Sequence, residues 1–198
     1  MRAVEESAYG EKEQRAGRAL ARGGAVGGII VDVGSVVASV EDSDGVWTAR
    51  VGLPVLDDAS RATLLEVVAA EAGRAPALLA GELPHPLVEH AEQMGVELLP
   101  YGGELDATCT CEAWVDPCVH ALALMSQVTW LLDRDPLVLV HLRGLPRDEL
   151  LARLHERSGA EPEAAEDADV DVAVDAAARA ARVLELLSDP DARIDHLF

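Results

Sequence analysis

The sequence contains little positive charge and few aromatic residues. Lys12 is its one lysine, and its 198 residues hold 16 basic against 36 acidic side chains, for a formal net charge of −20. Because phosphate groups are bound through basic surfaces, this balance argues against broad contact with nucleic acid or anionic lipid. Aromatic residues make up 3% of the chain, too few to provide stacking platforms for single-stranded nucleic acid.

Long apolar runs are absent as well. No stretch of the chain is long and apolar enough to span a membrane, and the first residues lack the apolar segment of a signal peptide. We therefore expect a cytoplasmic protein without membrane contact, whose cysteine thiols stay reduced. Apolar residues nonetheless make up 49% of the sequence, which is enough to bury a core within one main domain.

Sequence patterns typical of common enzyme classes are also missing. The glycines at 23, 24, 27 and 28 match neither the GxGxxG pattern of dinucleotide-binding folds nor the GxxxxGK pattern of phosphate loops. No Ser-His-Asp order and no particular carboxylate pair stands out among the 36 acids. We predict that the chain is not an enzyme.

Apolar and polar residues alternate in three consecutive segments near the N-terminus. These segments, 29–33, 36–41 and 47–51, are separated by turn sequences at Gly34-Ser35 and Asp42–Gly45. Such spacing predicts a three-stranded antiparallel meander. Helical patterns or helix start signals are found at 10–23, 57–73, 76–80, 86–95, 121–132, 135–143 and 146–155, and 96–99 could form a short strand. We predict an α+β fold with an N-terminal meander and a helical middle.

The C-terminal part of the chain differs in composition from the rest. Between Ser158 and Ala178 there are seven acids and no base. Such a segment is typical of a solvated linker. We predict a main domain at 10–157, an acidic linker at 158–174, and a C-terminal helix and tail at 175–198 that docks on another protein.

All three cysteines lie within ten residues and a histidine follows them. Cys109, Cys111, Cys118 and His120 form the pattern CxC, six residues, CxH. Three thiolates and one imidazole make the tetrahedral ligand set that zinc prefers. Since four protein ligands leave no open position, we predict one structural zinc ion, held in a knuckle that leads into the following helices.

The spacing of these four residues suits metal binding. In an extended segment, residues i and i+2 point the same way, so the first two cysteines can bind one ion together. Pro117 prevents a helix from running back through Cys118, which places Cys118 and His120 at the start of the helix predicted at 121–132.

Two other interpretations of the cysteines are less favoured. They could be buried apolar residues near an incidental histidine, or form a disulfide, but a reduced chain rarely concentrates all its cysteines in this way. His85 and His90 could form a second metal site, although such histidines are more often surface or capping residues. We expect Trp114, between the ligand pairs, to pack over the knuckle and not to contact a base.

The cysteine and histidine pattern resembles the SWIM zinc finger, whose ligands follow CxC…CxH. The resemblance covers about residues 10–154, which look like bacterial, chiefly actinobacterial, SWIM proteins, and it includes Arg18–Arg22, Leu79–Leu83, Asp133–Pro136 and Leu142–Gly144. It implies a zinc finger at 105–132 with Cys109, Cys111, Cys118 and His120 as the ligands.

SWIM modules occur in bacterial proteins associated with Swi/Snf-type ATPases and in plant Mutator transposases, and they are thought to bind DNA or proteins. The resemblance therefore implies a zinc-stabilised protein-interaction module, an accessory subunit of a DNA-translocating ATPase. The alternative is a direct DNA-binding zinc finger protein. Many SWIM fingers carry a basic residue before the histidine, whereas this chain has Val119, and residues 104–120 hold four acids and no base. DNA binding would need the arginines of 15–22, so we favour a protein partner.

Overall fold

A computed structural model describes residues 2–158 of the chain. The chain divides into two compact units, Met1–Leu154 and His155–Phe198. The linker predicted at 158–174 and the helix and tail predicted at 175–198 lie outside the described residues, except for Ser158, where the last described helix ends. Within residues 2–158, no helix is long and apolar enough to cross a membrane.

The first unit contains a four-stranded antiparallel sheet in the order β1-β2-β3-β4. The predicted meander is confirmed, and its strands are β1 (Val26–Asp32), β2 (Ser35–Glu41) and β3 (Val46–Gly52). The fourth strand, β4 (Asp106–Cys109), joins β3 from more than fifty residues further along the chain. Four residues are too short to show a clear alternation, so this strand was not predicted.

Helices precede the sheet, separate β3 from β4, and follow β4, which confirms the α+β fold. In chain order they are α1 (Arg2–Ser7), α2 (Glu11–Arg22), α3 (Asp58–Ala69), α4 (Arg74–Leu79), α5 (His85–Gln93), the 3-10 turn η1 (Gly102–Glu104), α6 (Val119–Leu132), α7 (Leu137–Leu142) and α8 (Arg147–Ser158). The segment 96–99 forms no strand. Val96 and Leu98 alternate as buried residues there, but they pack into the core without a neighbouring strand.

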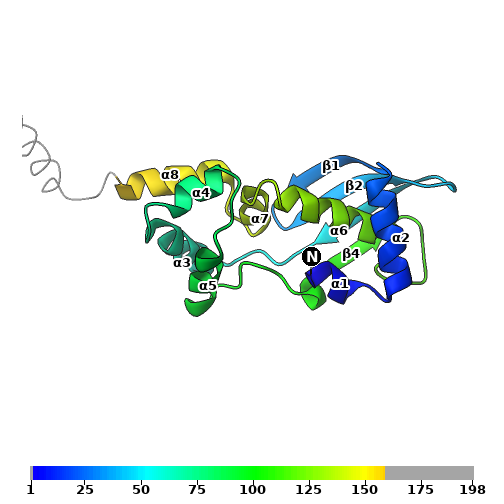
Figure 1. The fold of residues 1–198 in the computed structure, drawn as a ribbon, viewed down its shortest axis with the longest axis horizontal. Helices are drawn as coiled ribbons and strands as arrows, with labels where there is room; N and C mark the ends of the chain where they lie inside the picture. The colour runs from blue at the N-terminus through cyan, green and yellow to red at the C-terminus, as the bar shows by residue number, and fades with distance from the viewer. Residues whose placement is uncertain (1, 159–198) are drawn as a thin grey trace, which may run out of the picture. The chain divides into compact units, whose positions relative to one another are not determined.

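The buried apolar residues form two clusters. The first, which we call the leucine cluster, joins α3, α4, α5, α7 and α8 through Leu64, Leu78, Leu87, Leu139 and Leu150, among others. The second, the sheet cluster, lies between the sheet and α6 and includes Ala21, Val40, Ala49, Leu122 and Leu124. Figure 1 shows α6 running along the sheet and α2 crossing the beginning of α6.

Close backbone packing allows α2 to cross α6. A Cβ atom added to Gly17 would lie 2.6 Å from the Cβ of Leu122 and 3.0 Å from the carbonyl oxygen of Val119. Any larger residue at position 17 would therefore push α2 away from the first turns of α6. Because the start of α6 carries two of the predicted zinc ligands, Cys118 and His120, this crossing bears directly on the site.

Candidate metal centre

The first pair of cysteines is positioned by the sheet. Cys109 is the last residue of β4 and pairs with Ala49 of β3. The N–H of Thr110 donates to the carbonyl of Thr48 at 3.1 Å, and the N–H of Thr48 donates to the hydroxyl oxygen of Thr110 at 2.9 Å. Thr110, the middle residue of the CxC segment, is thus fixed on β3 through its backbone and its side chain, so Cys111 follows directly from an ordered strand.

The second pair of residues is positioned by the start of α6. Cys118 is the N-cap of this helix, and its sulfur accepts a hydrogen bond from the N–H of Ala121 at 3.5 Å. The helix begins at Val119, two residues before the predicted start, so His120 lies in its first turn. A helix N-terminus favours a thiolate, which suits Cys118 as a ligand.

The structure brings all four predicted residues together. One ligand atom from each of Cys109, Cys111, Cys118 and His120 lies within 4.8 Å of the other three. The Nδ1 atom of His120 is 3.8 Å from the sulfur of Cys109 and 4.0 Å from that of Cys118. Tetrahedral zinc with bonds of about 2.0 Å to nitrogen and 2.3 Å to sulfur separates such atoms by about 3.5 Å. The donor set and its spacing therefore fit one zinc ion.

The protonation of the three thiols differs with their surroundings. Burial raises the pKa of Cys109 to about 12 and also raises the pKa of Cys118. Burial opposes ionisation of Cys111 too, but hydrogen bonds involving His120, the Ala113 backbone and the other two thiols outweigh it and lower its pKa to about 7. Cys111 is thus the thiol that ionises most readily before a metal arrives, because its neighbours stabilise the thiolate.

An acidic residue that the sequence did not single out completes the surroundings of the histidine. Asp42, in the turn between β2 and β3, has its Oδ2 atom 2.8 Å from Nε2 of His120. Hydrogen bonds with His120 and then with Trp47 hold the pKa of Asp42 well below its usual range. The sequence showed Asp42 as a turn residue in Asp-Ser-Asp-Gly, and no local signal connects it to His120.

The loop between the two ligand pairs projects into solvent. Trp114 is 91% exposed, so the expectation that it packs over the knuckle is wrong. Glu112, Ala113 and Asp116 are exposed beside it in sequence. A hollow of about 250 Å³ lies against the loop, lined by Glu112, Asp116, Val115, the three cysteines and neighbouring residues of β4 and α6. The loop is attached to the fold on both sides by the candidate ligands.

The other sequence candidates do not form a second site. His85 pairs with Glu89 at 3.3 Å, whereas Nδ1 of His90 lies 2.8 Å from a guanidinium nitrogen of Arg74. Within residues 2–158, the cysteine and histidine cluster is the one group of three or more potential metal ligands.

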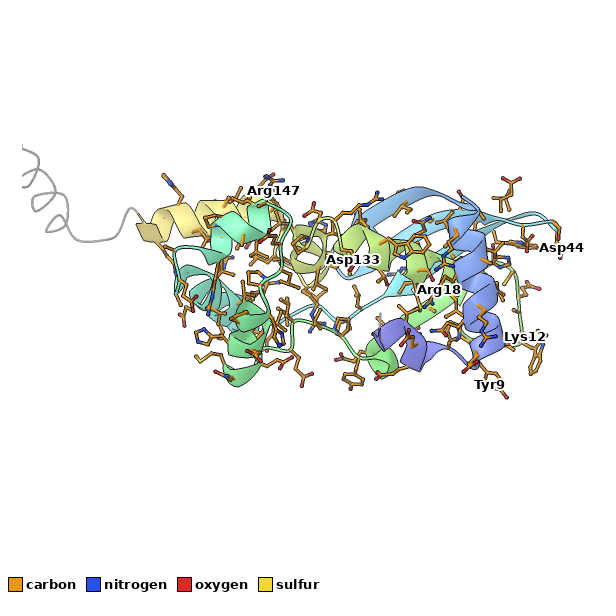
Figure 2. All side chains as sticks on the ribbon, viewed as in Figure 1. Tyr9, Lys12, Arg18, Asp44, Asp133 and Arg147 are labelled. Carbon is orange, nitrogen blue, oxygen red and sulfur yellow. The ribbon has the colours of Figure 1, made fainter. Side chains whose placement is uncertain are left out.

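The arginines of 15–22 that DNA binding would need are Arg15, Arg18 and Arg22, and two of them pair with carboxylates. Arg15 pairs with Glu11 at 2.7 Å, and Arg18, which can be followed in Figure 2, pairs with Glu5 at 3.7 Å. Two of the three arginines that would have to contact DNA are therefore next to carboxylates, which weakens their attraction for phosphate.

An apolar cavity of about 400 Å³ lies elsewhere in the first unit, between the sheet, α6 and the loop that precedes α5. Its lining includes Val36, Leu53, Leu83 and Met125, and Asp133 is the one titratable residue among its lining residues. A single carboxylate at an apolar wall provides no acid–base pair, so this cavity adds no catalytic constellation to the site.

Comparison with known proteins gives two matches. Residues 93–128 match the SWIM zinc finger family. A Mycobacterium tuberculosis protein, uncharacterized protein Rv2102, is 33% identical over 153 residues, which is 76% of this chain and 55% of that protein. The chain thus spans about half the length of the curated relative that it matches. No solved structure matches the chain.

Proposed function

Because this chain carries a SWIM zinc finger with one zinc ion, we propose that it is a protein-interaction module whose finger presents a partner surface. In this proposal Cys109, Cys111, Cys118 and His120 hold the ion. The donor set, the spacing of its atoms and the closed shell of four protein ligands support a structural role for the metal.

The observation that carries the interaction role is the loop between the ligand pairs. A tryptophan that is 91% exposed is unusual in a folded protein, and tryptophan is enriched among the residues that dominate protein interfaces. The metal would hold both ends of the loop, so that Trp114 binds without a large loss of conformational entropy. The loop is also acidic, through Glu112 and Asp116, which favours a basic partner surface.

A DNA-translocating ATPase of the Swi/Snf type is the partner that we propose. The SWIM class occurs with such ATPases in bacteria, and a motor that binds DNA has basic surfaces that suit an acidic accessory protein. Direct DNA binding is the alternative. The net charge of −20 and the pairing of Arg15 and Arg18 with carboxylates argue against it.

Metal analysis tests the ligand assignment. We expect one zinc per chain in the freshly purified protein, and loss of the ion when serine replaces any one of the three cysteines or alanine replaces His120. His141→Gln, at a histidine outside the cluster, is the matched control and should keep the ion. A protein without zinc, or variants that all retain it, would refute the assignment.

Co-purification with the Swi/Snf-type ATPase of the organism that encodes this chain tests the interaction role. Trp114→Ala should weaken capture by about 30-fold or more, since an interface tryptophan often contributes about 2 kcal/mol. Met94→Ala changes an exposed apolar residue at the end of α5 and should leave capture unchanged. Saturable binding of the full chain to labelled duplex DNA at physiological salt would favour the alternative instead.

A further inference from the structure

The turn between β2 and β3 places a carboxylate against the side of His120 that faces away from the thiols. Nε2 of His120 lies 2.8 Å from Oδ2 of Asp42, while Nδ1 faces the sulfurs of Cys109 and Cys118. An ionised carboxylate can only accept a hydrogen bond, so Nε2 must carry the proton. In the neutral imidazole, Nδ1 is then left with a lone pair directed at the thiol cluster, which is the form of histidine that binds a metal.

Asp42 is itself held in place. Its Oδ1 atom accepts hydrogen bonds from the N–H groups of Asp44 at 2.9 Å and Gly45 at 3.1 Å, and from the indole N–H of Trp47 at 3.1 Å. The ring of Trp47 also packs near that of His120, with centroids 5.7 Å apart. One carboxylate oxygen is therefore occupied by the turn and by Trp47 of β3, and the other is directed at the histidine.

We propose that Asp42 is a positioning residue for the zinc site, which fixes His120 so that Nδ1 binds the ion, and that Trp47 holds Asp42 for this purpose. This inference rests on the assignment of His120 as a ligand above. Asp42 lies 78 residues before His120 and outside the CxC…CxH pattern. Carboxylates that bond the second nitrogen of a metal-bound histidine contribute about 10–100-fold to metal affinity in other proteins.

Replacement of Asp42 by asparagine tests this role with little change of shape. Three donors surround the position of Oδ1, so the amide oxygen of asparagine must stay there and the NH₂ group must face His120. The NH₂ group of the asparagine and the Nε2–H group of His120 would then face each other, and neither could accept a hydrogen bond. The conflict is relieved if the histidine proton moves to Nδ1, which removes the lone pair that the ion needs.

We expect Asp42→Asn to lower the zinc affinity of the full chain by about 10–100-fold, measured by competition with a chromophoric chelator. Asp44→Asn is the matched control, because it removes the same charge from the same turn. Asp44 is exposed near the tip of the turn (Figure 2), where its carboxylate bonds with the Ser43 hydroxyl. The control should bind zinc as the unchanged chain does.

Trp47→Phe gives a second variant that keeps an aromatic ring beside His120 but removes the indole donor. Its loss of zinc affinity should be smaller than that of Asp42→Asn, because the two backbone donors still hold Oδ1.

Long-range ¹H–¹⁵N NMR of the zinc-loaded, unchanged chain provides a measurement that needs no variant. It should show the His120 proton on Nε2 and the metal on Nδ1.

The possible outcomes separate this inference from the proposed function. If the unchanged chain binds no zinc, or binds it without His120, the ligand assignment itself fails. If the chain binds one zinc through His120, but Asp42→Asn matches Asp44→Asn in affinity or NMR places the metal on Nε2, the positioning role alone is refuted. A loss of affinity confined to Asp42→Asn and, more weakly, Trp47→Phe supports it.

Discussion

The leucine cluster and the sheet cluster are built from different residues. Ten of the fifteen buried members of the leucine cluster are leucines, whereas six of the fourteen buried members of the sheet cluster are alanines. A buried leucine removes much more apolar surface from water than an alanine does, so each residue of the leucine cluster contributes more to stability. The sheet cluster has two other features that can compensate. Its small residues allow close backbone packing, and the candidate zinc site lies at its edge, where Cys118 is a member of the cluster.

This contrast indicates where each part of the fold derives its stability. The helices of the leucine cluster are held together mainly by apolar burial, which the sequence carries within each helix. The sheet cluster depends on β4, α6 and the turn at Asp42 meeting at one point. We expect the two clusters to respond differently to metal removal, to loss of apolar volume and to loss of close packing.

Metal removal should have the largest effect, and it should fall on the sheet cluster. Zinc contributes an apparent 10–16 kcal/mol to isolated zinc-finger peptides at neutral pH, which is comparable to the stability of a whole domain. A strong chelator should therefore increase hydrogen exchange throughout 105–132 and along the edge of β3 that pairs with β4. The amides of α3 should keep their protection, since that helix lies in the leucine cluster.

Mass-spectrometric hydrogen exchange with and without chelator measures this difference. The chain with excess zinc added back is the control for direct effects of the chelator. Unchanged exchange around 109–132 would show that the metal has no structural role. Equal loss of protection in α3 would show that the two clusters unfold as one unit.

Several features of the fold and of the candidate site could be predicted from the sequence, because the residues that determine them are close together in the chain. The meander follows from alternation and from turn residues such as Gly34, and the proposed zinc ligands follow from the concentration of all cysteines beside one histidine. The α+β fold follows from the same patterns. In each case the residues that determine the structure lie within a few positions of one another.

Other features depend on contacts between distant segments. Strand β4 is too short to show its pairing with β3, and the contact of Asp42 with His120 spans 78 residues. The exposure of Trp114 depends on the direction in which the loop leaves the ligand pairs, which spacing alone does not determine. The buried guanidinium of Arg143, which donates to the carbonyls of Pro54 and Glu97 at 2.6 Å each, is likewise explained by the folded structure alone.

Loss of apolar volume in the leucine cluster should have the next largest effect. Leu64 is fully buried in α3, so Leu64→Ala should lower the free energy of unfolding by about 2–5 kcal/mol. Zinc content should stay at one ion per chain, because Leu64 belongs to the other cluster. Urea denaturation and metal analysis measure the two quantities. Leu79→Ala, at a leucine that is 42% exposed, is the control, and its effect should be much smaller.

Loss of close packing should destabilise the sheet cluster by a smaller amount. Gly17→Ala would force a Cβ atom to within 2.6 Å of the Cβ of Leu122, and overpacking of this kind costs about 1–3 kcal/mol. The better helix propensity of alanine would offset about 1 kcal/mol of that cost. Because α6 carries His120, zinc affinity should fall together with stability, unlike in Leu64→Ala.

Gly73→Ala is the control for this substitution, since a Cβ atom there would meet nothing within 4 Å. Thermal denaturation and chelator competition on both variants measure the effect. A Gly17→Ala chain with unchanged stability and zinc affinity would show that α2 can move without disturbing α6, and that the sheet cluster does not depend on this crossing.

The smallest effect should come from the N-cap of α3, and it should depend on pH. The carboxylate of Asp57 accepts a hydrogen bond from the N–H of Ser60 at 2.7 Å, and this bond lowers the pKa of Asp57. A carboxyl group whose pKa is lower in the folded state stabilises the fold fully above its unfolded pKa of about 3.9, and it loses that contribution as the pH falls through the folded value. The difference in stability between the unchanged chain and Asp57→Ala should therefore be complete near neutral pH and shrink below about pH 4.

Asp57→Asn separates the hydrogen bond from the charge. Asparagine caps helices about as well as aspartate but does not titrate, so this variant should resemble the unchanged chain near neutral pH and lack its pH-dependent loss in acid. Zinc is also released in acid as the thiolates become protonated, so the three chains must be compared at each pH, where this common effect cancels. Hydrogen exchange of the α3 amides is the suitable measurement, because it reports on the leucine cluster directly. If Asp57→Ala and the unchanged chain differ by the same amount at every pH, the Asp57 carboxylate does not act through its charge.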